Sequence, residues 1–147
     1  MAESSASSFE DPKLLAAAAY LLGGLLGSFA GGLAFISILV PAGIYVWKKS
    51  DAYVAFHSFQ ALLFTLFVFV LMYILGFLFV AQASSAYSNP YSYATGGGMM
   101  ATYSLVQIIW GLGLVFFLVD LFVAYKAYSG EKFKLPVLGN MAEKPFF

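Results

Sequence analysis

The sequence predicts an all-α, polytopic membrane protein with four transmembrane helices and both termini in the cytoplasm. Hydrophobic residues make up 62% of the 147 positions and charged residues only 10%. A soluble domain of this size could not bury so much apolar surface, because about half of its atoms must still face water. Long uncharged runs set the number of spans, and the placement of the lysines sets their orientation.

The charged residues exclude several classes of function. The seven basic residues are all lysines, so the chain lacks the bidentate guanidinium fork common at nucleic-acid sites, and we expect no nucleic-acid partner. There is no cysteine, and His57 is the single histidine, which makes a protein-held zinc ion improbable. We therefore expect no metal and no cofactor. The expected partners are the lipid bilayer and other membrane proteins or further copies of the chain.

Residues 1–12 read as a disordered polar tail. They include three acidic residues before the first lysine, which fits neither the basic start of a secretory signal nor the arginine-rich composition of a transit peptide. We expect the first hydrophobic segment to be an uncleaved anchor. Asp11 can cap the helix that follows, and Pro12 fits its first turn.

The first two spans are predicted to form a short hairpin. No charge interrupts residues 14–47, which as one helix would extend about 50 Å, against a hydrocarbon core of about 30 Å. The glycines of "GGLLGSFAGGLAF" supply a turn near the midpoint, so we expect spans at about 13–28 and 32–48. A rival interpretation keeps one helix, on which Gly23, Gly27 and Gly31 form a smooth stripe for helix packing.

Two further spans are predicted at about 53–82 and 102–128, separated by an uncharged loop rich in Ser, Gly and Tyr. With four spans every lysine falls on one side of the membrane, and the positive-inside rule then puts both termini in the cytoplasm of a multi-pass cell-membrane protein. Three spans would leave Lys13 on the other side, which is a small violation, so that alternative stays open.

Polar residues inside the spans are the candidate site. His57 and Gln60 are three residues apart and share a helix face, at a depth of about 6 to 13 Å from Asp51. Asp120 is the one acidic residue inside a span, at a similar depth from Tyr128. We hypothesise a polar cluster of His57, Gln60 and Asp120 that joins the third and fourth spans. It could lock the packing or relay protons, and we predict no catalytic residue.

Two segments resemble a known family. "YVAFHSFQALLF" is similar to a motif of the small membrane proteins related to the chloroplast inner-envelope import component of the Tic complex and to their prokaryotic homologues. "AYKAYSGEKFKLPVLGNMAE", with Gly130, Glu131 and Pro136, resembles their C-terminal pattern. "AAAAYLLGGLLG" also fits their first half. The resemblance implies four helices and, for plastid members, a role in protein translocation within a multi-subunit channel.

Residues 130–147 are predicted to form a cytoplasmic tail. Gly130 is suited to stop the fourth helix, and apolar residues interleaved with Lys132 and Lys134 suit a segment lying on the headgroups. A plain solvated tail is the alternative.

The functional expectation is a non-enzymatic scaffold or subunit of a membrane complex, with protein translocation or insertion as the process that the resemblance suggests. The alternative is a small oligomeric transporter or proton-coupled carrier. Such carriers generally hold an ionisable residue centrally in the bundle, whereas Asp120 is predicted near one face.

Overall fold

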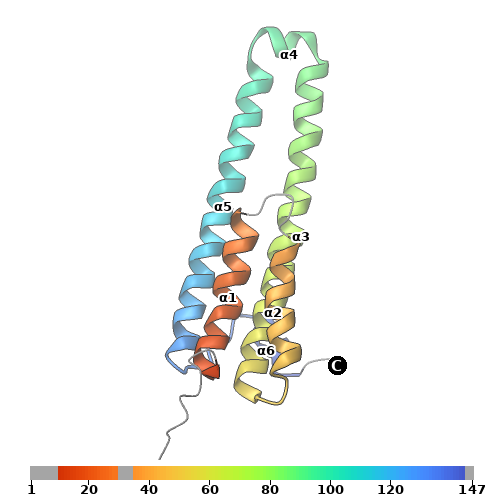
Figure 1. Cartoon of the computed structure of the whole chain (residues 1–147). Helices are drawn as coiled ribbons and strands as arrows, with labels where there is room; N and C mark the ends of the chain where they lie inside the picture. The colour runs from red at the N-terminus through yellow and green to blue at the C-terminus, as the bar shows by residue number, and fades with distance from the viewer. Residues whose placement is uncertain (1–9, 30–34, 145–147) are drawn as a thin grey trace, which may run out of the picture.

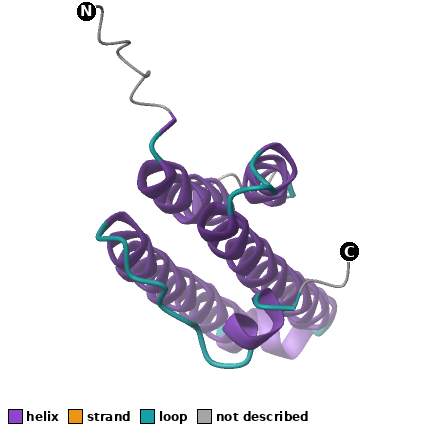
Figure 2. Ribbon diagram, turned by 90° about the horizontal axis from the view of Figure 1, so that it is seen from below, coloured by secondary structure: helices purple, strands orange, loops and turns teal. Residues whose placement is uncertain are grey.

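The computed structural model describes residues 10–29 and 35–144. Its regular elements, all of them helices within that part of the chain, are α1 (Pro12–Phe29), α2 (Ile36–Trp47), α3 (Ala52–Ser88), α4 (Pro90–Ala94), α5 (Gly97–Tyr128) and α6 (Leu138–Ala142). The helices α3 and α5 form a long hairpin with α4 at its turn, and α1 and α2 lie along its lower half (Figure 1). Seen from below, α6 lies beside the hairpin, on the side away from α2 (Figure 2).

The helix is interrupted between α1 and α2, as the hairpin interpretation predicts. The helix α1 ends at Phe29 and α2 begins at Ile36, and the two run in opposite directions (Figure 1). One continuous helix over residues 14–47 is therefore wrong. Gly31, the third glycine of the predicted stripe, lies outside the described residues.

Polar caps and a glycine define the helix ends near the base. The Asp51 carboxylate accepts hydrogen bonds from the backbone N–H groups of Tyr53 (2.9 Å) and Val54 (3.1 Å) at the start of α3. At the end of α5, Gly130 adopts φ 87°, a conformation that glycine adopts without the strain of a Cβ atom. The N–H of Glu131 then reaches the carbonyl of Lys126 (3.0 Å), which closes the helix as a Schellman motif.

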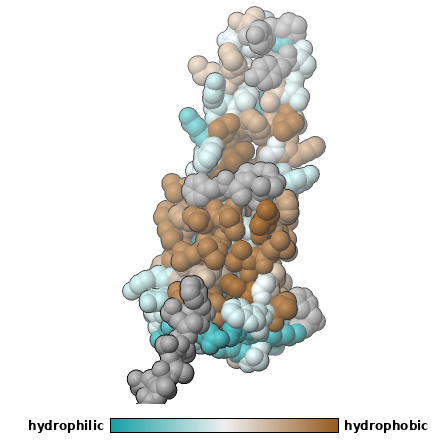
Figure 3. All heavy atoms as spheres, viewed as in Figure 1, coloured by the Kyte–Doolittle hydropathy of each residue, from teal (hydrophilic) through white to brown (hydrophobic). Residues whose placement is uncertain are grey.

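Two of the helices are long and apolar enough to cross a membrane, namely those that cover Ala52–Ser85 and Gly97–Tyr128. Shorter apolar helices precede them, with 18 residues in α1 and 12 in α2. At 1.5 Å per residue, α2 is only about 18 Å long, less than a hydrocarbon core of about 30 Å. Hydrophobic residues form a broad band across the visible face, and hydrophilic residues gather at its lower end (Figure 3).

Small residues bring α1 close to the hairpin. Four consecutive alanines precede Tyr20, and Ala16 and Ala19 are fully buried in a cluster that also contains Ala61 of α3 and Ala124 of α5. Small side chains let helix backbones approach closely in membranes. A second cluster, near the base, joins Tyr45, Phe56, Phe59 and Ala142, and α6 packs against α3 there.

Candidate functional site

A buried tyrosine organises the polar residues at the base of α3. The amide nitrogen of Gln60 donates a hydrogen bond to the Tyr20 hydroxyl (2.9 Å), and the same hydroxyl lies 3.3 Å from Nδ1 of His57. All three side chains are fully buried. Buried polar groups lose much of their cost when they bond to one another. The sequence placed His57 and Gln60 on one face, and the structure joins them through α1.

Gln60 also holds the C-terminal segment. Its amide nitrogen donates to the carbonyl of Phe133 (3.2 Å), and its Oε1 accepts from the backbone N–H of Leu135 (3.2 Å). A Cβ atom on Gly139 would lie 2.6 Å from Cβ of Lys134 and 2.9 Å from Oε1 of Gln60, so only glycine fits there. The segment from Glu131 to Ala142 is therefore docked against the bundle through a buried side chain.

Aromatic rings enclose His57. Its ring lies 4.6 Å from the ring of Tyr53 and 5.1 Å from that of Phe56, both in edge-to-face geometry. The Tyr53 hydroxyl donates to the carbonyl of Ala127 in the last turn of α5. The Nε2 atom of His57 is buried and has no hydrogen-bond partner within residues 10–29 and 35–144.

Asp120 lies apart from these bonds. Its side chain is 6% exposed and faces Gly24, where an added Cβ atom would lie 2.2 Å from Oδ2. Gly24 is one helical turn beyond Tyr20 on α1. Among the described residues, no hydrogen bond or ion pair reaches the carboxylate. The structure therefore links His57 and Gln60 but gives Asp120 a different neighbour.

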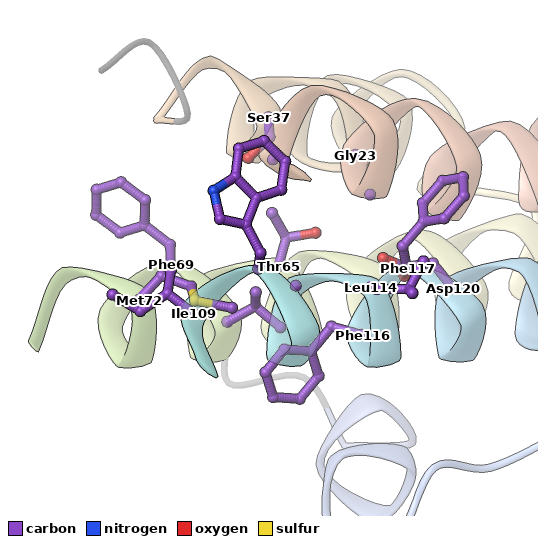
Figure 4. A pocket seen from close by; sticks show the side chains of 15 residues that line it. Gly23, Ser37, Thr65, Phe69, Met72, Ile109, Leu114, Phe116, Phe117 and Asp120 are labelled. Carbon is purple, nitrogen blue, oxygen red and sulfur yellow. The ribbon is translucent and has the colours of Figure 1, made fainter. Parts of the chain in front are cut away.

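A cavity of about 400 Å³ opens above Asp120 between α1, α2, α3 and α5 (Figure 4). Its polar wall consists of Ser37, Thr65 and Asp120, and the rest is apolar or aromatic. Two of the predicted packing glycines face it: a Cβ atom would lie 3.2 Å from Thr65 Oγ1 at Gly23 and 3.4 Å from Ser37 Oγ at Gly27. Both glycines thus sit where α1 approaches a neighbouring helix.

The predicted tail motif lies at the base. Gly130 ends α5, and Glu131 forms an ion pair with Lys126 (3.0 Å). Pro136 begins a tight turn in which its carbonyl accepts from the N–H of Leu138 (2.8 Å), while Val137 takes φ 66°. The tail is thus folded against the lower end of the bundle, and its place on the headgroups stays a prediction.

Sequence reasoning missed Tyr20 and the contact between Gly24 and Asp120. Tyr20 carries a hydroxyl in the middle of an apolar alanine-rich helix, and a buried phenol normally finds a hydrogen-bond partner. That rule could have identified it. Gly24 is spaced four residues from Ser28, which is four from Gly32, a pattern that indicates helix packing. The pattern does not reveal which residue of α5 faces Gly24.

The fold and the polar residues together define a helical membrane protein whose C-terminal segment packs against its lysine-bearing end. The chain belongs to the magnetosome magnetite crystal formation protein family, whose model matches residues 11–142. It is also similar to a UPF0132 membrane protein of Methanocaldococcus jannaschii, with 30% identity over 122 residues that cover 82% of this chain and 89% of the relative. No solved structure matches the chain.

These findings correct the expected relationship to the Tic-complex import component. The family model that covers nearly the whole chain is that of the magnetosome proteins, and the similar archaeal protein carries a membrane-protein name without an import role. The motifs behind the expectation were short and mostly apolar. Such segments recur in unrelated membrane helices because the bilayer itself selects their composition.

Proposed function

We propose that this protein is a non-enzymatic structural subunit of an assembly in the cell membrane, a multi-pass protein with both termini in the cytoplasm. Its proposed partners are other membrane proteins or further copies of itself. The observation that carries the proposal is the length of the α3–α5 hairpin, which extends well beyond α1 and α2 (Figure 1).

The upper hairpin exposes apolar side chains beyond the reach of a hydrocarbon core. From Ala52 at the charged end, a core of about 30 Å takes up about 20 residues of an upright helix. Phe77, Leu78 and Val80 of α3 lie past that point, and Phe77 is 69% exposed. Lipid tails do not cover side chains at that height, so apolar surface there favours contact with another protein.

Crosslinking tests this proposal. A photoreactive phenylalanine analogue at Phe77 should give discrete adducts with other polypeptides in native membranes. The matched control is Val46, which is 74% exposed on α2 near the charged end, and which should give lipid adducts only. If both positions yield only monomer, the hairpin has no protein partner and the proposal fails.

The proposed orientation follows from the lysines. The start of α1, the end of α2, the start of α3 and the end of α5 meet at the lower end of the molecule (Figure 1). All seven basic residues are lysines, and they lie near those helix ends or in the C-terminal segment. Cytoplasmic loops carry such an excess of lysine. Because the chain has no cysteine, Ser50→Cys and Ser88→Cys give single labelling sites at opposite ends of α3.

Only Ser88→Cys should react with an impermeant maleimide in intact cells, while Ser50→Cys should need permeabilisation. Labelling of Ser50→Cys in intact cells would reverse the orientation.

The family description names the formation of magnetite crystals. Between Asp51 and Asp120 the sequence has no Asp, Glu, Lys or Arg, so the α4 end of the hairpin offers no carboxylate to an iron ion. We therefore propose no contact between a crystal and carboxylates at the α4 end.

A further inference from the structure

The cavity above Asp120 combines a buried carboxylate with an aromatic wall. Asp120 as a residue is 6% exposed, and no described residue bonds to its carboxylate. An ionised carboxylate in an apolar site costs several kcal/mol unless a partner balances it. The helices around it supply no cation, because the described lysines lie at the helix ends near the base or in the C-terminal segment.

The rest of the wall suits an organic cation. Phe69, Trp110, Phe116 and Phe117 line the cavity together with Met72. Aromatic faces attract ammonium groups through their quadrupoles, and this attraction strengthens where water is excluded. A carboxylate at one end can pair with a protonated amine, and the aromatic rings along the sides attract its charge.

The volume of the cavity and its opening restrict the class of ligand further. A volume of about 400 Å³ holds a small ligand and is too small for a two-chain lipid. Trp110 and Leu114 on the cavity wall are largely exposed, on the side of α5 where lipid tails would lie. From Tyr128, Asp120 is about 12 Å deep along α5, so a ligand would enter from within the bilayer.

From this geometry we propose that the cavity binds a lipophilic primary ammonium ion, with its charged group at Asp120 and its alkyl chain along Phe69, Trp110 and Phe116. The site is independent of the proposed assembly role, since it lies inside one chain.

Fluorescence of Trp110 provides the assay. The chain has two tryptophans, and Trp47→Phe leaves Trp110 as the reporter in the cavity wall. In detergent micelles, 8-bromooctylamine should quench Trp110 saturably, because bromine quenches indole at contact. In Asp120→Asn, which keeps the side-chain shape, the half-saturating concentration should rise at least tenfold. The alcohol 8-bromooctanol should bind weakly and equally to both proteins.

A matched pair of glycine variants tests whether the ligand occupies the cavity. A Cβ atom on Gly113 would come no closer than 3.8 Å to Met72 Cε, whereas Gly111 has nothing within 4 Å and does not line the cavity. Gly113→Leu should fill the space and abolish saturable quenching, and Gly111→Leu should leave it unchanged. Circular dichroism would establish that both variants retain their helices.

Three results would overturn the proposal: equal quenching curves for the parent and Asp120→Asn, equal affinity for the amine and the alcohol, or saturable binding that survives Gly113→Leu. The second would mean that Asp120 meets a neutral ligand. None of these results would bear on crosslinking at Phe77, so the two proposals fail separately.

Discussion

Replacement of Gly24 by alanine tests the contact between α1 and α5 most directly. The new Cβ atom would lie 2.2 Å from Oδ2, 2.7 Å from Cγ and 2.9 Å from Cβ of Asp120, where ordinary contacts are 3.4 Å or longer. A carboxylate on so short a side chain cannot swing clear of all three overlaps. The helices must therefore separate, and such overpacking costs about 3 kcal/mol at the upper end of its usual range.

Helix propensity offsets part of that cost. Alanine is favoured over glycine in a helix interior by about 1 kcal/mol, which leaves a net loss of about 2 kcal/mol for Gly24→Ala. Gly43 in α2 is the matched control, because its added Cβ atom would meet nothing within 4 Å. Gly43→Ala should raise the free energy of unfolding by up to about 1 kcal/mol.

The assay is SDS-induced unfolding in mixed micelles, followed by circular dichroism, for Gly24→Ala, Asp120→Ala and the double variant. Because Asp120→Ala removes the two closest overlaps, the double variant should be more stable than additivity predicts, by about 1 kcal/mol or more. Additive losses, or a Gly24→Ala variant as stable as Gly43→Ala, would show that Asp120 does not face Gly24.

Three further predictions concern the C-terminal segment. Gln60→Leu removes the hydrogen bonds of Gln60 to the segment and to α1, so the free energy of unfolding should fall by about 2 to 4 kcal/mol. The protease Lys-C should then cleave the tail faster. Cleavage at the parent rate would contradict this prediction. Val137 is a β-branched residue at φ 66°, so Val137→Gly should stabilise the protein by about 1 kcal/mol, measured by the same SDS titration. A hydrogen bond from Lys134 lowers the pKa of Glu143. The ion pair therefore stabilises α6 at pH values above the pKa that Glu143 has in the unfolded chain. The stabilisation is lost as the pH falls through the lower pKa that Glu143 has in the folded protein. Hydrogen exchange of α6, corrected for intrinsic rates, should show that loss in the parent and not in Glu143→Gln.

Local signals in the sequence predicted the ends of helices well. Asp11 and Gly130 act through bonds to residues at most five positions away, so their roles as cap and stop need no tertiary information. The break between α1 and α2 followed from length together with the glycines at its midpoint. Length alone does not decide it, because the uncharged α3 continues for 37 residues as one helix. These features depend on the chain and the solvent only.

The segment between α3 and α5 was predicted less well. Residues 83–101 were expected to form a loop because they are rich in Ser, Gly and Tyr, yet α3 continues to Ser88 and α5 begins at Gly97. The serine hydroxyls fit the helix by bonding back to carbonyls of the preceding turn, as Ser84 does to Val80 (2.8 Å) and Ser88 to Ser85 (3.1 Å). Composition does not reveal this choice, since the same hydroxyls also stabilise turns.

By itself, the sequence determined that the protein is an α-helical membrane protein with its lysines at one end. The bilayer requires apolar spans and favours lysines in the loops on one side, and both features can be read from composition and charge placement. Only the tertiary structure decided which polar residues meet. His57 and Gln60 reach Tyr20, which is 37 and 40 positions away, while Asp120 faces Gly24. The predicted depths of these residues were similar, but contact also requires the rotation of each helix about its axis. That rotation is set by the packing of small residues on α1 against α3 and α5.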